Sequence, residues 1–206
     1  MLTGPLEATN RAYAVAKIAG VEMCWSYNRE YGTQFLAAMP TNLYGLGDRY
    51  DLQGSHVIPA LIRKCHEAKA SGAGEVVIWG TGNPKREFLY SEDAAGAFIY
   101  LMSLPDKEFR QVCGDSEHPP IVNVGGGTEL TIRELAAKVC DAVGYRGRLK
   151  FDASKLDGTP RKLLDVSRLA SLGWRASTSL ESGLRSAYAD FLVRFPEPAL
   201  NEGRSP

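Results

Sequence analysis

Two residues with the types and spacing needed for proton-transfer chemistry lie near the start of the sequence. Tyr13 and Lys17 occur in Asn10-Arg-Ala-Tyr-Ala-Val-Ala-Lys-Ile-Ala-Gly20. A spacing of four puts both side chains on one face of a helix, about one turn apart. A cation held there stabilises the phenolate, which suits the tyrosine hydroxyl to general acid–base work. The pattern Y-x-x-x-K also arises by chance on amphipathic helices, so the surrounding sequence has to decide between the two interpretations.

The elements that position this pair are predicted from hydrophobic periodicity. Apolar residues recur at helical intervals over residues 11–31, and Gly32 ends that helix. Further helices are predicted at 56–70, at 91–104, after Thr131 (which forms a capping box with Glu134), and after Ser179. Strands are predicted at 34–39, 75–79, 86–90, 121–124 and 149–151, and 105–120 is predicted to be a surface loop. Strands alternate with helices, so the predicted fold class is α/β.

Composition excludes several classes of function. The 206 residues are 44% hydrophobic, enough for a sizeable core in one domain or one domain plus a lobe. Lysine plus arginine equals aspartate plus glutamate at 24 each, so no net charge favours a nucleic acid or an anionic membrane. No apolar run approaches the roughly 20 residues of a membrane span. Four scattered cysteines without a C-x-x-C pair predict no metal site and a reduced, cytoplasmic setting.

Five segments in collinear order carry a resemblance to a known family. They are Tyr13-Ala-Val-Ala-Lys-Ile-Ala-Gly20, Met39-Pro-Thr-Asn-Leu-Tyr-Gly45, Ser55-His-Val-Ile-Pro-Ala-Leu61, Trp79-Gly-Thr-Gly-Asn-Pro-Lys-Arg-Glu-Phe-Leu89 and Phe151-Asp-Ala-Ser-Lys-Leu-Asp-Gly-Thr-Pro-Arg-Lys-Leu-Leu-Asp165. On them the chain resembles the extended short-chain dehydrogenase/reductase family. Within that family it is similar to the enzymes that convert GDP-4-keto-6-deoxymannose to GDP-L-fucose by 3,5-epimerisation and 4-keto reduction. The fifth segment is characteristic of these enzymes.

The resemblance implies catalytic and cofactor-binding roles. Tyr13 would donate a proton to the ketone oxygen, while Lys17 activates it and holds the nicotinamide ribose of NADP(H). His56, at the start of a helix that disfavours the imidazolium, would be the acid of the epimerisation step. Cofactor contacts are also implied for His56 and for Pro40, Thr41, Asn42 and Leu43, which follow a predicted strand. The alternative for this last stretch is a plain strand exit ended by proline.

Four further residues are implied to contact the GDP-sugar: Lys64, Trp79, Arg86 and Asp157. Arginine suits a phosphate because its guanidinium donates two parallel hydrogen bonds. At the position of Lys64 the family commonly has arginine, so the charge is kept but the forked geometry is not. Trp79 could instead fill the core, and Asp157 could simply form a turn. Arg161 and Lys162 either reinforce the anion site or are solvated charges. His66 and His118 lack a matching motif and are predicted to lie on the surface.

The resemblance also implies missing parts. No G-x-x-G-x-x-G loop follows a strand. The resemblance also implies a catalytic serine and an epimerisation cysteine upstream of the tyrosine, and no serine or cysteine precedes Tyr13. We therefore expect the C-terminal portion of the enzyme, inactive alone, with an incomplete Rossmann-like sheet whose N-terminal strands are absent. The predicted domains are 1–55 for that sheet, 56–195 for a smaller α/β substrate-binding lobe with segments returning to the first domain, and 196–206 for a frayed tail. A homodimer is expected for the full-length enzyme.

Two alternatives to this function stay open on the sequence. One is another sugar-nucleotide epimerase or dehydratase of the same family. The other is a non-enzymatic remnant that binds GDP-sugars or only dimerises.

Overall fold

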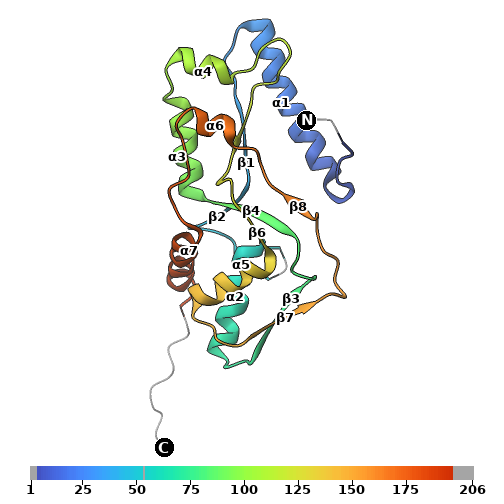
Figure 1. Cartoon of the computed structure of the whole chain (residues 1–206), viewed down its shortest axis with the longest axis vertical. Helices are drawn as coiled ribbons and strands as arrows, with labels where there is room; N and C mark the ends of the chain where they lie inside the picture. Colours follow the sequence, from blue (N-terminus) through green and yellow to red (C-terminus); the bar gives the residue numbers. More distant parts are fainter. Residues whose placement is uncertain (1–3, 53, 197–206) are drawn as a thin grey trace, which may run out of the picture. The chain divides into compact units, whose positions relative to one another are not determined.

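Parallel strand pairs form the framework of the structure, a computed structural model that describes residues 4–52 and 54–196 (Figure 1). Strand β1 (Ala37–Pro40) pairs with β5 (Ile121–Val124), β2 (Asn42–Tyr44) with β4 (Lys85–Tyr90), and β3 (Glu75–Trp79) with β7 (Arg148–Asp152). All three pairs are parallel, as strands connected through helices require. The α/β class predicted from the sequence is confirmed.

The chain divides into two units that are interleaved along the sequence. Unit 1 comprises residues 1–41, 94–127 and 164–176, and unit 2 comprises residues 42–93, 128–163 and 177–206. The sequence predicted domains at 1–55 and 56–195, with segments of the second returning to the first. That assignment stays a prediction, and each unit is described below by itself.

Unit 1 holds the β1–β5 pair and the long helix α1. Its helices are η1 (Ala8–Asn10), α1 (Arg11–Tyr31), most of α3 (Ser91–Met102), α4 (Asp106–Val112) and α6 (Ser167–Ser171). Helix α1 ends where predicted, because Gly32 adopts a left-handed conformation with φ of 64° that a glycine accepts without strain. The buried apolar residues of this unit come from α3, α4, β5 and α6, and include Leu101, Val122 and Leu169.

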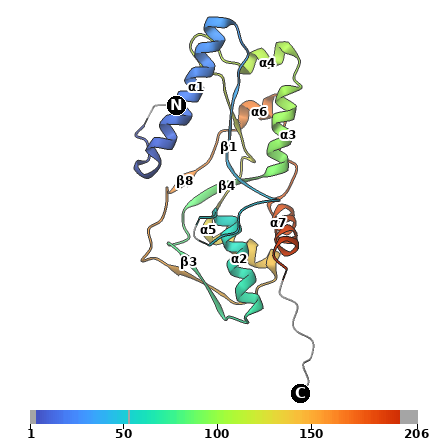
Figure 2. The same ribbon diagram turned by 180° about the vertical axis from the view of Figure 1, so that it is seen from behind.

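Unit 2 is organised around strand β4. Strand β6 (Glu129–Thr131) pairs antiparallel with β4, and β8 (Arg161–Lys162) pairs parallel with its first two residues. Helices α2 (Val57–Ala70), α5 (Ile132–Val143) and α7 (Leu180–Arg194) pack together and enclose one hydrophobic cluster that includes Ile62, Leu135 and Leu184 (Figure 2). The predicted capping box of α5 is confirmed: Thr131 Oγ1 accepts from Glu134 N, and the Glu134 carboxylate accepts from Thr131 N.

Two predictions are wrong: that residues 105–120 form a loop throughout, and that His66 lies on the surface. Residues 105–120 begin with helix α4 rather than forming a loop throughout, because Pro105 fits before a helix and Asp106 and Glu108 stabilise its first turn. His66 is only 9% exposed, since α2 places it beside α7. Its Nδ1 lies 3.1 Å from the hydroxyl of Tyr188, and its ring packs edge-on against Phe191. His118 is exposed, as predicted.

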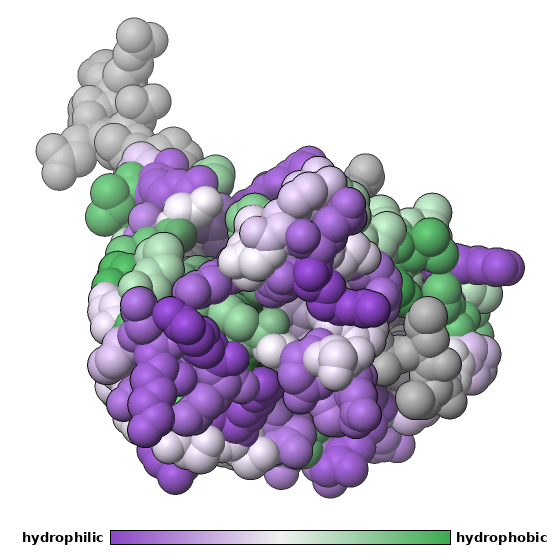
Figure 3. Space-filling view, turned by 90° about the horizontal axis from the view of Figure 1, so that it is seen from above, coloured by the Kyte–Doolittle hydropathy of each residue, from purple (hydrophilic) through white to green (hydrophobic). Residues whose placement is uncertain are grey.

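The surface of the molecule is largely polar on the face drawn in Figure 3. The face of the molecule drawn in Figure 3 carries mostly hydrophilic residues, with apolar residues in separate patches. Among the described residues, no helix is long and apolar enough to cross a membrane. The tail predicted to fray lies outside the described residues from position 197 onward.

Candidate active site

The tyrosine–lysine pair lies on one face of α1, as its spacing predicted. Lys17 Nζ lies 5.4 Å from the centre of the Tyr13 ring, over its face, where the ring quadrupole attracts a cation. The Tyr13 side chain is 67% exposed, and Lys17 is exposed as well. Both functional groups are therefore accessible to a ligand that approaches this face of the helix.

Polar contacts from the C-terminal half of α1 hold the helix within unit 1. Trp25 Nε1 donates to the Asp115 carbonyl at 2.6 Å, and Asn28 Nδ2 donates to the carbonyls of Phe35 and Cys113. Hydrogen bonds from the backbone amides of Glu117 and His118 and from the His118 ring hold the pKa of Asp115 below its usual range. The Asp115 carboxylate thereby holds the loop whose Asp115 carbonyl accepts the hydrogen bond from Trp25.

The strand predicted at 34–39 lies at 37–40 and includes Pro40, and Asn42 and Leu43 belong to the next strand, β2. Strand β1 ends at Pro40, and Thr41 N donates to the Val124 carbonyl at 3.0 Å, so this end of β1 stays paired with β5. The boundary between the units follows Thr41. In unit 2, Asn42 Nδ2 donates to the Glu87 carbonyl at 2.8 Å, which ties β2 to β4 through a side chain.

His56 occupies the start of α2, where the sequence predicted it. Its backbone is extended, with φ of −67° and ψ of 167°, and its exposed side chain leaves the helix N-terminus uncapped. The imidazole can therefore meet a ligand at the positive end of the helix dipole. Apolar packing fixes this helix, since its own residues Ile58, Leu61 and Ile62 are buried.

Trp79 and Lys64 form an exposed cation–aromatic pair in unit 2. Side chains alternate along β3, so Val76 and Ile78 are buried while Trp79 is 66% exposed. The alternative that Trp79 fills the core is therefore wrong. Lys64 Nζ lies 5.2 Å from the centre of its ring and donates to the Val77 carbonyl at 3.3 Å. An exposed indole beside a cation can stack with a planar base while the cation meets a phosphate.

Arg86 and Asp157 lie close together, although their sequence positions are 71 apart (157 − 86). Arg86 is half-buried; burial lowers its pKa, and the Asp157 carboxylate opposes that change. Its Nη1 donates to the Lys85 carbonyl at 2.7 Å. The Asp157 carboxylate itself accepts from Thr81 N at 2.9 Å and from Thr81 Oγ1 at 2.6 Å. Asp157 thus forms a turn contact in addition to facing the arginine.

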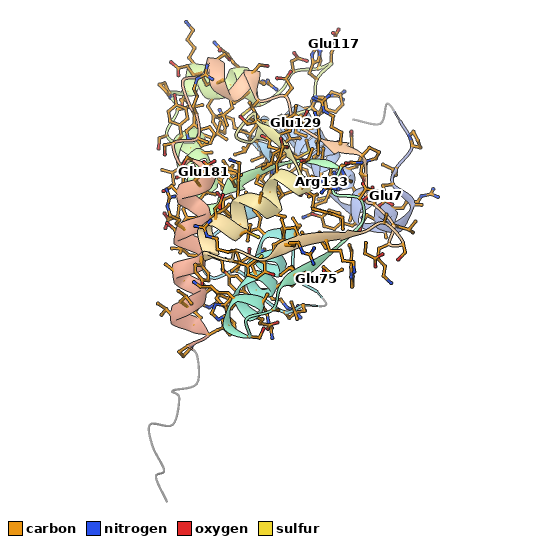
Figure 4. All side chains as sticks on the ribbon, turned by 60° about the horizontal axis from the view of Figure 1, so that its bottom comes forward. Glu7, Glu75, Glu117, Glu129, Arg133 and Glu181 are labelled. Atoms are coloured by element: carbon orange, nitrogen blue, oxygen red, sulfur yellow. The ribbon has the colours of Figure 1, made fainter. Side chains whose placement is uncertain are left out.

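One carboxylate, that of Glu129, contacts two cations beside this group. Glu129, which is labelled in Figure 4, contacts Arg161 Nε at 2.7 Å and Lys85 Nζ at 3.4 Å. The hydrogen bond from Arg161 is the main reason that the pKa of Glu129 is lowered. In the register of β4 and β8, Lys85 is opposite Arg161, and Arg86 is opposite Lys162. Because side chains alternate along a strand, the Arg86–Lys162 pair faces away from Glu129.

Sequence reasoning gave no role to two residues that shape this region, Thr81 and Arg133. Thr81 lies inside one of the matched segments, but its partner Asp157 is 76 residues away. Arg133 Nη2 donates to the Thr81 carbonyl at 2.8 Å, and its guanidinium lies 3.8 Å from the centre of the Phe151 ring. A threonine between two glycines, Gly80 and Gly82, was the available signal in the sequence.

The structure assigns the site residues to the two units. Unit 1 contains Tyr13, Lys17, Pro40 and Thr41, whereas unit 2 contains Asn42, Leu43, His56, Lys64, Trp79, Arg86 and Asp157. Within the described part of the chain, no cluster of three or more histidine, cysteine, aspartate or glutamate side chains could hold a metal ion. The chemistry available is therefore a tyrosine–lysine pair in one unit, and an indole with flanking cations in the other.

Comparison with known proteins gives this chemistry a family context. The family model described as "NAD dependent epimerase/dehydratase family" matches residues 1–125. The chain is 53% identical over 192 residues to a GDP-L-fucose synthase of Sinorhizobium fredii, covering 93% of this chain and 58% of that protein. It is 53% identical over 194 residues to the GDP-L-fucose synthase of Escherichia coli, covering 93% of this chain and 59% of that protein.

A solved structure agrees with these relatives. A GDP-L-fucose synthetase from Naegleria fowleri bound to NADP superimposes with a TM-score of 0.80 and 28% identity, covering 94% of this chain and 59% of that one. The chain thus spans about three fifths of the length of the curated relatives it matches.

Proposed function

The chain belongs to the NAD dependent epimerase/dehydratase family, and from that premise we propose that its protein is an NADP-dependent GDP-L-fucose synthase. The reaction is epimerisation of GDP-4-keto-6-deoxymannose at C3 and C5, followed by reduction at C4 to GDP-L-fucose. The observation that carries the proposal is the combination of Lys17 over Tyr13 in unit 1 with Lys64 over Trp79 in unit 2. The 53% identity to two enzymes of that name supports it.

Reduction of the ketone uses the Tyr13–Lys17 pair. The Tyr13 hydroxyl delivers the proton to the C4 oxygen as carbon becomes tetrahedral, and the Lys17 charge stabilises the phenolate that remains. The bound cofactor, NADPH, supplies the hydride that C4 receives. C3 and C5 are both α to the ketone, so a base can remove a proton from either carbon to give an enolate. That base is proposed to lie in the part of the relatives that this chain does not match, and His56 returns a proton to the enolate carbon.

The residues available fit a dinucleotide of this kind. Lys17 and Tyr13 are exposed on one face of α1, and Pro40 and Thr41 lie at the C-terminal end of a parallel strand, where doubly wound sheets bind ligands. Asn42, Leu43 and His56 complete the set proposed to hold the cofactor. About two fifths of each curated relative has no counterpart in this chain. We therefore propose that unit 1 supplies part of a larger dinucleotide-binding sheet, and that the chain alone does not turn over.

The GDP moiety is proposed to bind unit 2. Trp79 stacks on the guanine, Lys64 and Arg86 donate charge-assisted hydrogen bonds to the diphosphate, and Asp157 accepts from a hydroxyl group.

The four free cysteines are consistent with the proposed cytoplasmic setting.

Isothermal titration calorimetry of the 206-residue chain with GDP tests this proposal. We expect weak binding, because two charge-assisted hydrogen bonds contribute roughly 1.5–3 kcal/mol each. Arg86→Ala should weaken it at least tenfold, and the matched control Arg148→Ala, an exposed arginine on β7, should not. Equal binding by wild type and Arg86→Ala removes Arg86 from the site. Absence of binding by a folded wild type refutes the GDP site.

A separate measurement addresses turnover. We expect the purified chain with NADPH and the keto-sugar to give no decrease in absorbance at 340 nm above background. Measurable turnover would contradict the proposed dependence on parts of the relatives that this chain does not match.

We also propose that α1 contributes to a homodimer. Several large apolar side chains of α1 are exposed, among them Val15, Met23 and Tyr27. A helix with this much uncovered apolar surface is a candidate interface. Sedimentation at micromolar concentration should give a dimer that Met23→Glu weakens, and a wild-type monomer would contradict the proposal.

A further inference from the structure

The turn at residues 80–84 has an unusual backbone that brings a distant loop close. Gly80 and Gly82 have φ of 86° and 79°, a region that glycine occupies without strain. A Cβ at Gly80 would collide with the Asp157 carboxylate, and one at Gly82 would collide with the Phe151 ring. Both glycines therefore allow close approach of the segment 151–157 to this turn.

Thr81 is the residue of this turn that Asp157 holds. Thr81 Oγ1 accepts from Asn83 N at 3.2 Å, so its single hydrogen is directed to Asp157 Oδ2 at 2.6 Å. The other carboxylate oxygen, Oδ1, accepts from Thr81 N at 2.9 Å. Both bonds are to an ionised acceptor, which makes them stronger than neutral hydrogen bonds.

Arg133 of α5 holds the opposite side of the same residue. Its Nη2 donates to the Thr81 carbonyl, and its own backbone N donates to the Gly82 carbonyl at 3.0 Å. The guanidinium is fixed by its position over Phe151. Thr81 is therefore a rigid attachment point, because both its amide and its carbonyl are engaged by side chains from other elements.

The loop that Asp157 belongs to has little packing of its own. Residues 153–158 are exposed, and Leu156 is 98% exposed. Its ends are held by Lys155 N donating to the Asp152 carbonyl and by Lys85 N donating to the Pro160 carbonyl. Between these ends, Asp157 fixes the middle of the loop to Thr81. A Cβ at Gly158 would lie 3.2 Å from Arg86 Nη2, so the fixed loop runs directly past that guanidinium.

We infer that Thr81 and Asp157 form a latch that positions loop 153–160 beside Trp79 and Arg86, and that Thr81 is thereby a positioning residue for the nucleoside diphosphate. The inference rests on the proposed function for its ligand. The latch holds the Asp157 carboxylate near Arg86 before any ligand arrives. Binding therefore does not include the entropic cost of ordering loop 153–160. Thr81 itself needs no contact with the ligand.

Limited proteolysis tests the latch without any ligand. Lys155 is exposed, two residues before Asp157, and offers a trypsin site whose cleavage is followed by mass spectrometry. Thr81→Val keeps the shape but removes the hydroxyl, so we expect cleavage after Lys155 to be roughly fivefold to tenfold faster than in wild type. Thr81→Ser should restore the wild-type rate, and the exposed Thr128→Val is the matched control. Cleavage of Thr81→Val at the wild-type rate overturns the latch.

Calorimetry with GDP on the same variants tests the link to recognition. We expect Thr81→Val to weaken GDP binding roughly threefold to tenfold, and Thr81→Ser to bind as wild type does. Faster cleavage with unchanged GDP affinity overturns the positioning role. If folded wild type binds no GDP, the proposed function fails, and the cleavage rates still decide whether the latch exists. Circular dichroism of Thr81→Val, with Asp157→Asn as a second variant, separates release of the loop from unfolding.

Discussion

Helices α1 and α5 differ in what holds them. Helix α1 has 21 residues and buries none of them, although it carries Tyr13 and Lys17. Helix α5 has 12 residues, buries five of them, and begins with a complete capping box. The tyrosine pair is therefore held by a few polar contacts such as Trp25 with Asp115, whereas the helix behind the proposed GDP face is part of a hydrophobic core. Nucleotide recognition should therefore tolerate changes that displace α1.

Core truncation gives the largest contrast between the two helices. Leu135 is fully buried in α5, so Leu135→Ala should lower the free energy of unfolding by about 2–5 kcal/mol. Ile18 in α1 is only half-buried, and Ile18→Ala should cost less than about 1 kcal/mol because less apolar surface returns to water. Urea denaturation followed by circular dichroism measures both. Equal losses would mean that α1 is as firmly packed as α5.

Ligand affinity gives the second contrast. Lys64, Trp79 and Arg86 all lie in unit 2, and the sequence contains no G-x-x-G-x-x-G loop after a strand. We expect this chain to bind GDP at least tenfold more tightly than NADPH, a difference of about 1.4 kcal/mol. Tyr13→Phe should leave the GDP affinity unchanged. Tighter binding of NADPH than of GDP in parallel titrations would reverse the comparison.

Helix caps give a smaller contrast. Thr131→Ala removes the side-chain acceptor at the start of α5 and should cost about 0.5–2 kcal/mol. Asn10 is the residue before α1, and its side chain does not cap the helix. Its side-chain amide Nδ2 instead donates to the Glu7 carboxylate at an exposed position. Asn10→Ala should therefore change the melting temperature much less than Thr131→Ala. A larger effect at Asn10 would show that the start of α1 is held more firmly than its contacts indicate.

Acid gives the smallest contrast. Hydrogen bonds from Thr131 hold the pKa of Glu134 below the ordinary value of 4.5. A depressed pKa stabilises the fold above that ordinary value, and this contribution is lost as the pH falls through the lower, folded value. Glu134→Gln should therefore lose less thermal stability than wild type below about pH 4.5. The control Glu22→Gln, on exposed α1, should follow the wild-type curve, and identical curves for all three would contradict the prediction.

The sequence predicted the long elements well because their signals are local. Hydrophobic periodicity and Gly32 predicted both ends of α1. A run of β-branched and aromatic residues predicted β3. The short strands β2, β6 and β8 were not predicted. They have two or three residues each, and only pairing with distant β4 makes them strands. The same reason explains His66, whose burial depends on Tyr188 and Phe191 far along the chain.

The candidate site follows the same division. The shared face of Tyr13 and Lys17 follows from a spacing of four, and the position of His56 follows from the start of α2. Exposure of Trp79 could not be decided from its sequence, because either face of β3 could have been covered. The contact of Asp157 with Thr81 was not predicted, because it depends on two positive-φ glycines and on a loop returning from β7. The site roles themselves stay predictions.

The crowded pairing of β4 has a consequence for exchange with solvent. Its first residues pair with β6 and β8, and its last residues pair with β2, so the strand is bonded to neighbours along its whole length. Amide deuterons should therefore enter β4 only when unit 2 opens as a whole, long after they have entered the exposed backbone of loop 153–160. Arg86 lies on this slowest-exchanging strand. A proposed anion ligand thus meets an arginine whose backbone stays in place on the timescale of ligand exchange.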